Sequence, residues 1–122
     1  MGGQYRKEAG IAGETAALLY LRDRGLQRVA QNYRCKAGEI DLAMLDGATL
    51  ALIEVRYRAD TRFGGAAASV IWRKQRRIVN AARHLLQSRT ELRRYPVRFD
   101  VVAVSPGEPE LQVEWIRHAF TL

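Results

Sequence analysis

Residues 38–58 read GEIDLAMLDGATLALIEVRYR, and this stretch decides the fold that the sequence predicts. Two apolar runs flank an Asp46-Gly47 turn signal, which is typical of a β-hairpin. The first run carries carboxylates at alternating positions, Glu39 and Asp41, and the second run carries Glu54. A buried carboxylate is costly unless a cation or hydrogen bonds compensate for its charge. We therefore expect chemistry at this hairpin before any other part of the chain.

The length of the hairpin loop decides how the two acids meet. A two-residue loop at Asp46-Gly47 sets Asp41 diagonal to Glu54, and a four-residue loop over 46–49 sets the two acids directly opposite each other. Both registers keep the acids on one face, whereas a one-residue slip separates them. Directly opposed Cβ atoms lie about 5 Å apart, so one Mg²⁺ or Mn²⁺ could be shared, because such cations take oxygen ligands. The simpler explanation is that Glu39 and Asp41 pair with arginines on a solvated face.

Size and charge indicate one domain, 1–122, with a basic surface. The net charge is +7 and the pI about 10.2, while lysine occurs only at Lys7, Lys36 and Lys74. An arginine-rich surface favours polyanions, nucleic acid above all. A genome of high GC content would raise the arginine content of the whole chain without any such role. Function classes that need a membrane are not expected, because the chain has no apolar run of membrane-spanning length.

The lone Cys35 excludes an internal disulfide, and no signal peptide is expected because the first residues, 1–7, are not followed by an apolar core. Both features fit a reducing compartment, so we expect a cytoplasmic protein. His84 and His118 are isolated and have no ligand partners at zinc spacing.

Hydrophobic periodicity predicts two helices and five strands. The expected elements are a helix from Lys7 to Gly25, strands Leu26–Tyr33, Glu39–Leu45 and Leu50–Tyr57, a loop Ala59–Gly65, a helix Ala67–Gln87, and strands Val97–Val104 and Leu111–Arg117. The first three strands are close enough in sequence for an antiparallel meander. The strand after the second helix can return parallel by a crossover. The fold class is therefore α/β, a three-layer arrangement with a mixed central sheet.

Several short motifs together resemble a known family. They are Gly13-Glu14, Asn32-Tyr33-Arg34, the Gly-Glu-Ile-Asp-Leu block at residues 38–42, the IEVRYR segment at residues 53–58, Phe63-Gly64, and the RFDVV segment at residues 98–102. The pattern resembles the YraN-like family of small bacterial proteins. That family in turn resembles the PD-(D/E)XK, or restriction-endonuclease-like, nucleases and, within them, the archaeal Holliday-junction resolvases. The resemblance implies a restriction-endonuclease-like fold with a four- or five-stranded mixed sheet.

By position, the resemblance implies that Asp41 and Glu54 are metal-binding acids and that Glu14 assists them from the first helix. Glu14 also extends the inward-facing apolar row of that helix. An acid in the first half of a helix is equally explained by the helix dipole and by pairing with neighbouring basic residues. Arg56 stands where the nuclease motif has lysine.

Arg56 leaves three outcomes open. Arginine keeps its positive charge but does not act as a base, because it does not lose its proton in proteins. It could serve as an electrostatic clamp, Lys74 or Lys36 could take the lysine role, or cleavage could be lost while binding persists. Ile71, Ile78, Ala82 and Leu85 form the stripe of the second helix that is expected to face the core. Lys74 falls on this stripe, which favours it for the lysine role. A snorkelling surface lysine is the alternative.

These features predict a Mg²⁺- or Mn²⁺-dependent endonuclease-like protein that hydrolyses phosphodiester bonds, in DNA that is branched or single-stranded. Asp41, Glu54, Arg56 and Lys74 are the expected catalytic residues. The expected nucleic-acid contacts are Arg34, Lys36, Arg58, Arg73, Arg76 and Arg77. A non-catalytic nucleic-acid-binding module is the main alternative, and a protein that binds an acidic protein partner is a third. Resolvase-like relatives act as dimers, so a homodimer is a further expectation.

Overall fold

The computed structural model describes residues 2–58 and 70–121, with side chains from Gly10 onward. Its elements are α1 (Gly2–Asp23), β1 (Gln27–Cys35), β2 (Gly38–Asp46), β3 (Thr49–Tyr57), α2 (Trp72–Ser88), the 3-10 helix η2 (Thr90–Arg94), β4 (Val97–Ser105) and β5 (Gln112–Phe120). The expected order of helix, three strands, helix and two strands is confirmed, and η2 is an addition. The predicted loop Ala59–Gly65 lies outside the described residues.

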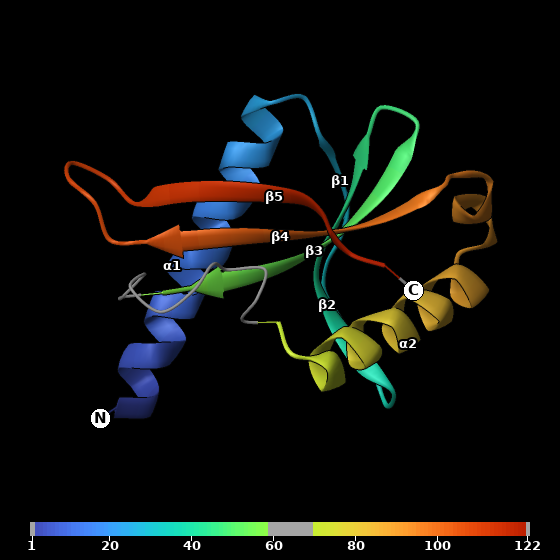
Figure 1. Ribbon diagram of the computed structural model, residues 1–122, viewed down its shortest axis with the longest axis horizontal. Helices are drawn as coiled ribbons and strands as arrows, with labels where there is room; N and C mark the ends of the chain where they lie inside the picture. Colours follow the sequence, from blue (N-terminus) through green and yellow to red (C-terminus); the bar gives the residue numbers. More distant parts are fainter. Residues whose placement is uncertain (1, 59–69, 122) are drawn as a thin grey trace.

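The five strands form one mixed sheet in the order β1-β2-β3-β4-β5. β1, β2 and β3 form an antiparallel meander, β3 and β4 are parallel, and β4 and β5 are antiparallel. Parallel neighbours need a crossover connection, and the chain between β3 and β4 includes α2 (Figure 1). The predicted meander and the predicted parallel return are both confirmed.

The sheet separates two hydrophobic cores, each closed by one helix. Leu52 of β3 packs with Ile78 of α2, whereas its neighbour Ile53 packs with Ala17 and Leu21 of α1. Successive strand residues point to opposite faces, so α1 and α2 lie on opposite sides of the sheet. In Figure 1, β4 and β5 pass in front of α1. The three-layer arrangement is therefore confirmed.

The C-terminal end of α1 follows the predicted glycine signal. Gly25 has φ +92, a left-handed conformation that favours glycine. The Gly25 amide donates to the Arg22 carbonyl at 2.9 Å, and the Leu26 amide donates to the Leu21 carbonyl at 3.1 Å. These bonds satisfy carbonyls at the helix end that have no partner within the helix. No helix in the described part of the chain is long and apolar enough to span a membrane.

The predicted start of the second helix is wrong. α2 begins at Trp72, and Val70 and Ile71 are not helical. Ile71 is the N-cap with an extended backbone and is 63% exposed, so it does not belong to the buried stripe. Val70 is buried in its place, whereas Ile78, Ala82 and Leu85 face the core as predicted. Val70 can reach the core because the extended backbone redirects its side chain before the helix begins.

Candidate functional site

The hairpin register brings the two predicted acids together. Asp46 pairs with Thr49 and Leu42 pairs with Ile53, so the next step along the register sets Asp41 opposite Glu54. Gly47, with φ +60, allows the tight reversal between the paired residues. The structure thus has the second of the two registers considered above, and the expectation that Asp41 and Glu54 lie close together is confirmed.

A local twist of β2 turns the Asp41 side chain toward β3. Ile40 packs in the core under α2, whereas Leu42 packs in the core under α1, so regular alternation fails between them. Asn32, which lies across from Asp41 on β1, has φ +53. The Asp41 Oδ2 atom accepts a 2.8 Å hydrogen bond from the Val55 amide. The carboxylate is therefore fixed by the backbone of β3 immediately after Glu54.

Glu54 is a buried carboxylate with two cations on one of its oxygens. Its side chain is 3% exposed. Its Oε1 atom lies 3.4 Å from Lys74 Nζ and 3.8 Å from Arg56 Nη1. Its Oε2 atom is buried and has no hydrogen-bond partner among the described residues. Burial, followed by the negative charge of Asp41, raises the pKa of Glu54 to about 8, against the opposing effect of Lys74 and Arg56.

Lys74 reaches the acid pair from α2 and links it to a third carboxylate, that of Glu39. Its Nζ atom lies 3.6 Å from Glu39 Oε1, and Glu39 Oε2 lies 3.5 Å from Arg34 Nε. Basic and acidic side chains thus alternate from Arg34 through Glu39 and Lys74 to Glu54 and Arg56. The structure brings Lys74 to the position from which it could take the lysine role. Glu39 also pairs with an arginine, as the simpler explanation expected.

Gly38 lets α2 approach closely enough for this contact. A Cβ atom at Gly38 would lie 1.9 Å from the carbonyl oxygen of Arg77, which is backbone and cannot swing away. Only glycine fits here without moving the helix. The first residue of the Gly-Glu-Ile-Asp-Leu block therefore sets the distance between α2 and the hairpin. The sequence pattern contained this glycine, but its role depends on a contact that the sequence does not show.

Glu14 lies near the pair and is not a full member of it. Burial raises the pKa of Glu14, a hydrogen bond with Asn32 lowers it, and the Asp41 charge raises it further. The described residues include no group of three or more His, Cys, Asp or Glu side chains that could hold a metal ion. Mg²⁺ is commonly held by one or two carboxylates and several waters. Asp41, together with the unpartnered Oε2 of Glu54, fits that mode of binding.

Comparison with known proteins places the chain in a family. Residues 13–104 match the model of the uncharacterised protein family UPF0102. The chain belongs to the UPF0102 family.

The UPF0102 protein of Pseudomonas putida KT2440 is 49% identical over 116 residues, which cover 92% of this chain and 91% of the relative. A UPF0102 protein of Saccharophagus degradans is 48% identical over 115 residues, covering 94% of each chain. The UPF0102 protein Reut_A3265 of Cupriavidus pinatubonensis is 54% identical over 115 residues, covering 93% of this chain and 85% of the relative. The YraN-like identification made from the sequence is thereby confirmed, and the likeness to nucleases stays a prediction.

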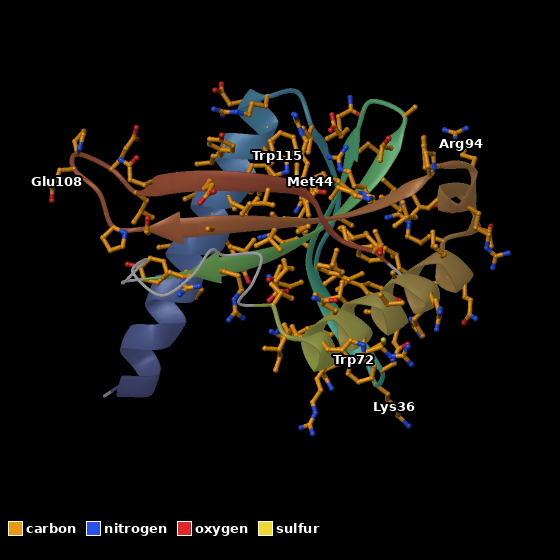
Figure 2. All side chains as sticks on the ribbon, in the orientation of Figure 1. Lys36, Met44, Trp72, Arg94, Glu108 and Trp115 are labelled. Atoms are coloured by element: carbon orange, nitrogen blue, oxygen red, sulfur yellow. The ribbon has the colours of Figure 1, made fainter. Side chains whose placement is uncertain are left out.

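The predicted nucleic-acid contacts of this UPF0102 protein lie on β1, in the β1–β2 turn, directly after β3 and on α2. Exposed members are Arg34, Lys36, Arg73, Arg76 and Arg77. Figure 2 shows Lys36 at the tip of the β1–β2 turn, beside the N-terminal part of α2. Arg58 differs because it is half-buried and its amide donates to the Val104 carbonyl at 2.8 Å. These placements form a basic surface next to the acid pair, and their role in binding stays a prediction.

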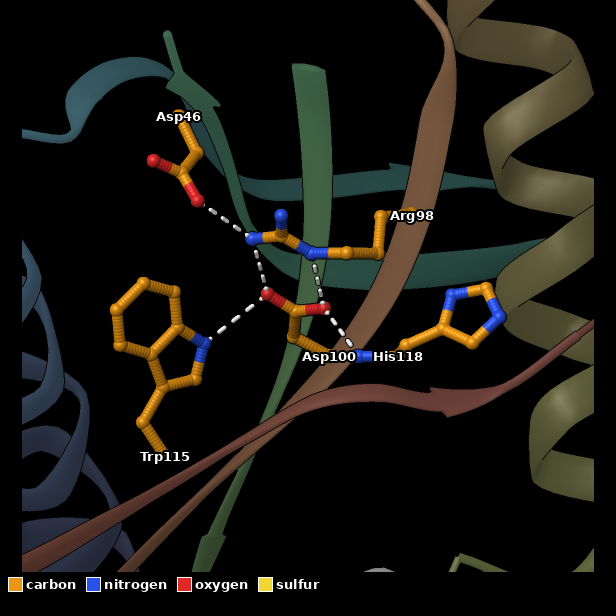
Figure 3. Close-up of polar contacts among 5 residues, drawn as sticks. All are labelled: Asp46, Arg98, Asp100, Trp115 and His118. Carbon is orange, nitrogen blue, oxygen red and sulfur yellow. Dashed lines mark hydrogen bonds and ion pairs between the residues drawn. The ribbon is translucent and has the colours of Figure 1, made fainter.

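A buried polar network at the other face of the sheet was not predicted from the sequence. Asp100 is fully buried and accepts two hydrogen bonds from Arg98, at 2.8 and 2.9 Å, one from Trp115 Nε1 at 3.0 Å and one from the His118 amide at 2.9 Å (Figure 3). Arg98 also donates to Asp46 at 2.9 Å. His118 has φ +54 where the β4–β5 register shifts, which turns its amide toward Asp100. In this UPF0102 fold, Asp100 joins β4, β5 and the β2–β3 turn.

An open groove of about 820 Å³ lies away from the acid pair, between α1 and β5. Tyr20 and Arg24 line it from α1, and Val113 lines it from β5. The Arg24 guanidinium stacks 3.4 Å from the centre of the Tyr20 ring. No residue lining this groove contributes to the acid pair or to its cations, so the candidate site of the UPF0102 protein is the hairpin and α2, not the groove.

Proposed function

We propose that this protein is a metal-dependent endonuclease that binds DNA and hydrolyses phosphodiester bonds. One observation carries the proposal: Lys74 Nζ lies 3.4 Å from Glu54 Oε1, and the Asp41 carboxylate lies across the strands from Glu54. The PD-(D/E)XK nucleases, which the sequence pattern resembles, combine two acids with a lysine. In this chain α2 supplies the lysine, while Arg56 occupies the strand position that the motif gives to lysine.

Each side chain has a role that follows from its chemistry. Asp41 and Glu54 would hold Mg²⁺ or Mn²⁺, supported by Glu14 and the Val55 carbonyl. The bound cation would polarise the phosphate and lower the pKa of an attacking water. Lys74 donates to phosphate oxygens and neutralises the negative charge that develops on them. Arg56 also donates to phosphate, but it does not accept a proton.

The second candidate is a nucleic-acid-binding module without turnover. Lys74 and Arg56 lie 3.4 and 3.8 Å from the same oxygen of Glu54. Two cations compensate much of the charge of a buried carboxylate without any metal. Under this alternative, the acid pair positions basic side chains for DNA and holds no catalytic ion.

Cleavage of a mixed panel of branched, single-stranded and duplex DNA tests the proposal. With Mg²⁺ or Mn²⁺ the wild type cuts at least one substrate, and with EDTA it cuts none. Asp41→Ala and Glu54→Ala bind that substrate but do not cut it. Glu91→Ala is the matched control, because it removes an exposed carboxylate of η2, and it cuts like the wild type. Salt-sensitive binding without any cleavage would establish the alternative instead, and absence of both binding and cleavage at low salt would exclude both candidates.

Location and assembly belong to the same proposal. A DNA substrate and a single free thiol, Cys35, fit the cytoplasm of a bacterial cell. A two-fold branched substrate would be matched by a homodimer. Sedimentation of the protein with and without a branched DNA measures this directly, and a monomer in both states would contradict the dimer.

A further inference from the structure

The start of α2 exposes two large apolar side chains side by side in sequence. Trp72 is 69% exposed and Ile71 is 63% exposed. Tryptophan has a large apolar surface and is usually well covered in folded proteins. Ile71 is exposed because it is the N-cap, but no such backbone reason applies to Trp72, which is already helical. Exposed apolar surface of this kind often marks a site where another molecule binds.

The surroundings of Trp72 are strongly basic. α2 has no acidic residue, and its first six residues are Trp72 followed by Arg73, Lys74, Gln75, Arg76 and Arg77. The Arg76 guanidinium lies 5.4 Å from the centre of the Trp72 ring. The β1–β2 turn, which carries Lys36, meets α2 at the Gly38–Arg77 contact (Figure 2). A partner for this surface must therefore be negatively charged and must also offer an apolar face to the ring.

Trp72 belongs to the same turn of α2 as Lys74, the lysine that contacts the acid pair. Lys74, two residues after Trp72, is the residue that lies 3.4 Å from Glu54. A helix rises 1.5 Å per residue, so the two backbones are about 3 Å apart along the helix axis. Residues two apart project from different sides of a helix, so a strand that stacks on Trp72 would lie within one turn of Lys74 but on the outer side of α2.

We propose that Trp72 is a stacking platform for an unpaired base of a single-stranded nucleic acid. Arg73, Arg76, Arg77 and Lys36 bind the phosphates of the same strand. Bases stack readily on exposed aromatic rings, and basic residues around the ring follow the backbone. In a continuous duplex the base faces are covered by their neighbours, so the ring selects single-stranded regions. The inference rests on the proposed function and narrows its substrate to nucleic acid with unpaired bases.

Binding measured in EDTA tests the inference without any contribution from cleavage. The probes are a fluorescent 15-nucleotide oligodeoxythymidine, an abasic strand of equal length, and a duplex. Trp72→Ala binds oligodeoxythymidine about tenfold more weakly than the wild type, the loss expected for one stacked base. The same variant binds the abasic strand and the duplex like the wild type, because their phosphate contacts are unchanged. Trp72→Phe keeps most of the affinity, since phenylalanine retains an aromatic face.

Leu19→Ala is the matched control. Leu19 is 58% exposed on α1, so this variant removes a similar degree of exposed apolar surface from another part of the molecule. It binds all three probes like the wild type. Thermal unfolding of each variant verifies that the exposed substitutions leave the fold intact.

Three results would overturn the inference. They are an unchanged affinity of Trp72→Ala for oligodeoxythymidine, an equal loss on the thymidine and abasic strands, and polyglutamate binding to Trp72 more tightly than oligodeoxythymidine of equal charge, which would indicate an acidic protein partner. A wild type that binds through Trp72 but cuts no DNA would support the inference and contradict the endonuclease. A wild type that cuts DNA while Trp72→Ala shows no binding defect would support the endonuclease and contradict the inference about Trp72.

Discussion

The Lys74 ammonium of α2 lies 3.4 Å from the Glu54 carboxylate of β3, and that carboxylate is 3% exposed. The contact crosses from one layer of the fold to another. It gives the acid pair a lysine from a helix, while Arg56 on the strand itself lies 3.8 Å from the same oxygen. Two cations, Lys74 and Arg56, are therefore placed for the role that the proposed reaction gives to lysine.

Replacing Lys74 should separate those two roles. Lys74→Ala should lower the cleavage rate at saturating DNA by about 100-fold, the usual effect of losing a positioned group that stabilises developing charge. Arg56→Lys in the Lys74→Ala background should restore part of that rate, because it returns a lysine to the same oxygen from the strand.

Lys36→Ala is the control for that experiment. Lys36 is exposed in the β1–β2 turn, so its loss should weaken DNA binding and leave the saturated rate unchanged. A rate that falls in Lys36→Ala and not in Lys74→Ala would show that the lysine role belongs to the turn.

Gly38→Ala should destabilise the fold and move α2. The added Cβ would lie 1.9 Å from the Arg77 carbonyl oxygen, so the helix must shift or the strand must bend. Overpacking of this kind costs about 1–3 kcal/mol, measured as a lower free energy of unfolding in urea. Cleavage at saturating DNA should also fall, since Lys74 moves with the helix.

Gly10→Ala tests whether that effect is specific to the contact. Gly10 lies within α1, and in the described part of the chain an added Cβ would meet no atom within 4 Å apart from its own helix backbone and neighbours. Alanine is the better helix former, so this variant should be unchanged or more stable by about 0.5–1 kcal/mol. Equal destabilisation by both alanines would mean that Gly38 has no special role.

Glu54 should make the metal-free protein less stable as the pH rises. Burial raises its pKa from 4.5 to about 8 in the folded state. Between these values the folded protein holds a proton that the unfolded chain has released, so the stabilisation is fully present below pH 4.5 and is lost as the pH rises through 8. The slope of the free energy of unfolding is at most about −1.4 kcal/mol per pH unit.

Urea unfolding in EDTA at several pH values measures this slope. Glu54→Gln should remove most of the decline, because glutamine does not titrate. Glu91→Gln should retain it, since Glu91 is exposed and its pKa is lowered by hydrogen bonds. Parallel curves for the wild type and Glu54→Gln would show that Glu54 is not the group responsible.

Asp100→Ala should affect stability far more than any step of DNA binding. The substitution removes the acceptor for Arg98, the Trp115 indole and the His118 amide (Figure 3). Breaking a buried charge pair costs about 3–5 kcal/mol, because the remaining groups stay buried without partners. Urea unfolding measures this loss. DNA affinity per folded molecule, measured in EDTA, should stay at the wild-type value, and a selective loss of affinity with full stability would place Asp100 in the binding site.

The hairpin and its acid pair could be predicted because their determinants are local. Side-chain alternation and an even-length loop predict that Asp41 and Glu54 share a face, and the turn signal at Asp46-Gly47 limits the possible registers. Lys74 could be proposed from helical spacing, since Ile78 and Leu85 mark the buried side of α2. Each of these features depends on residues that are near one another in sequence.

The remaining features depend on contacts between distant segments. The start of α2 was misplaced because Ile71 has the apolar character of a core residue, although an extended backbone at this N-cap exposes it. The role of Gly38 requires the position of Arg77, and the bonds of Asp100 require the register shift of β5 at His118. These contacts join segments that are far apart in the chain, so local sequence patterns do not predict them.

The most direct test of the account is a Mn²⁺ titration of the purified protein at pH 8, followed by the electron paramagnetic resonance of free Mn²⁺. The acid pair is predicted to bind one Mn²⁺ per protein molecule. Asp41→Ala and Glu54→Ala should lose that binding, and Glu91→Ala should keep it. A wild type that binds no Mn²⁺, or acid-pair variants that bind it as tightly as the wild type, would contradict the claim that Asp41 and Glu54 form a metal centre.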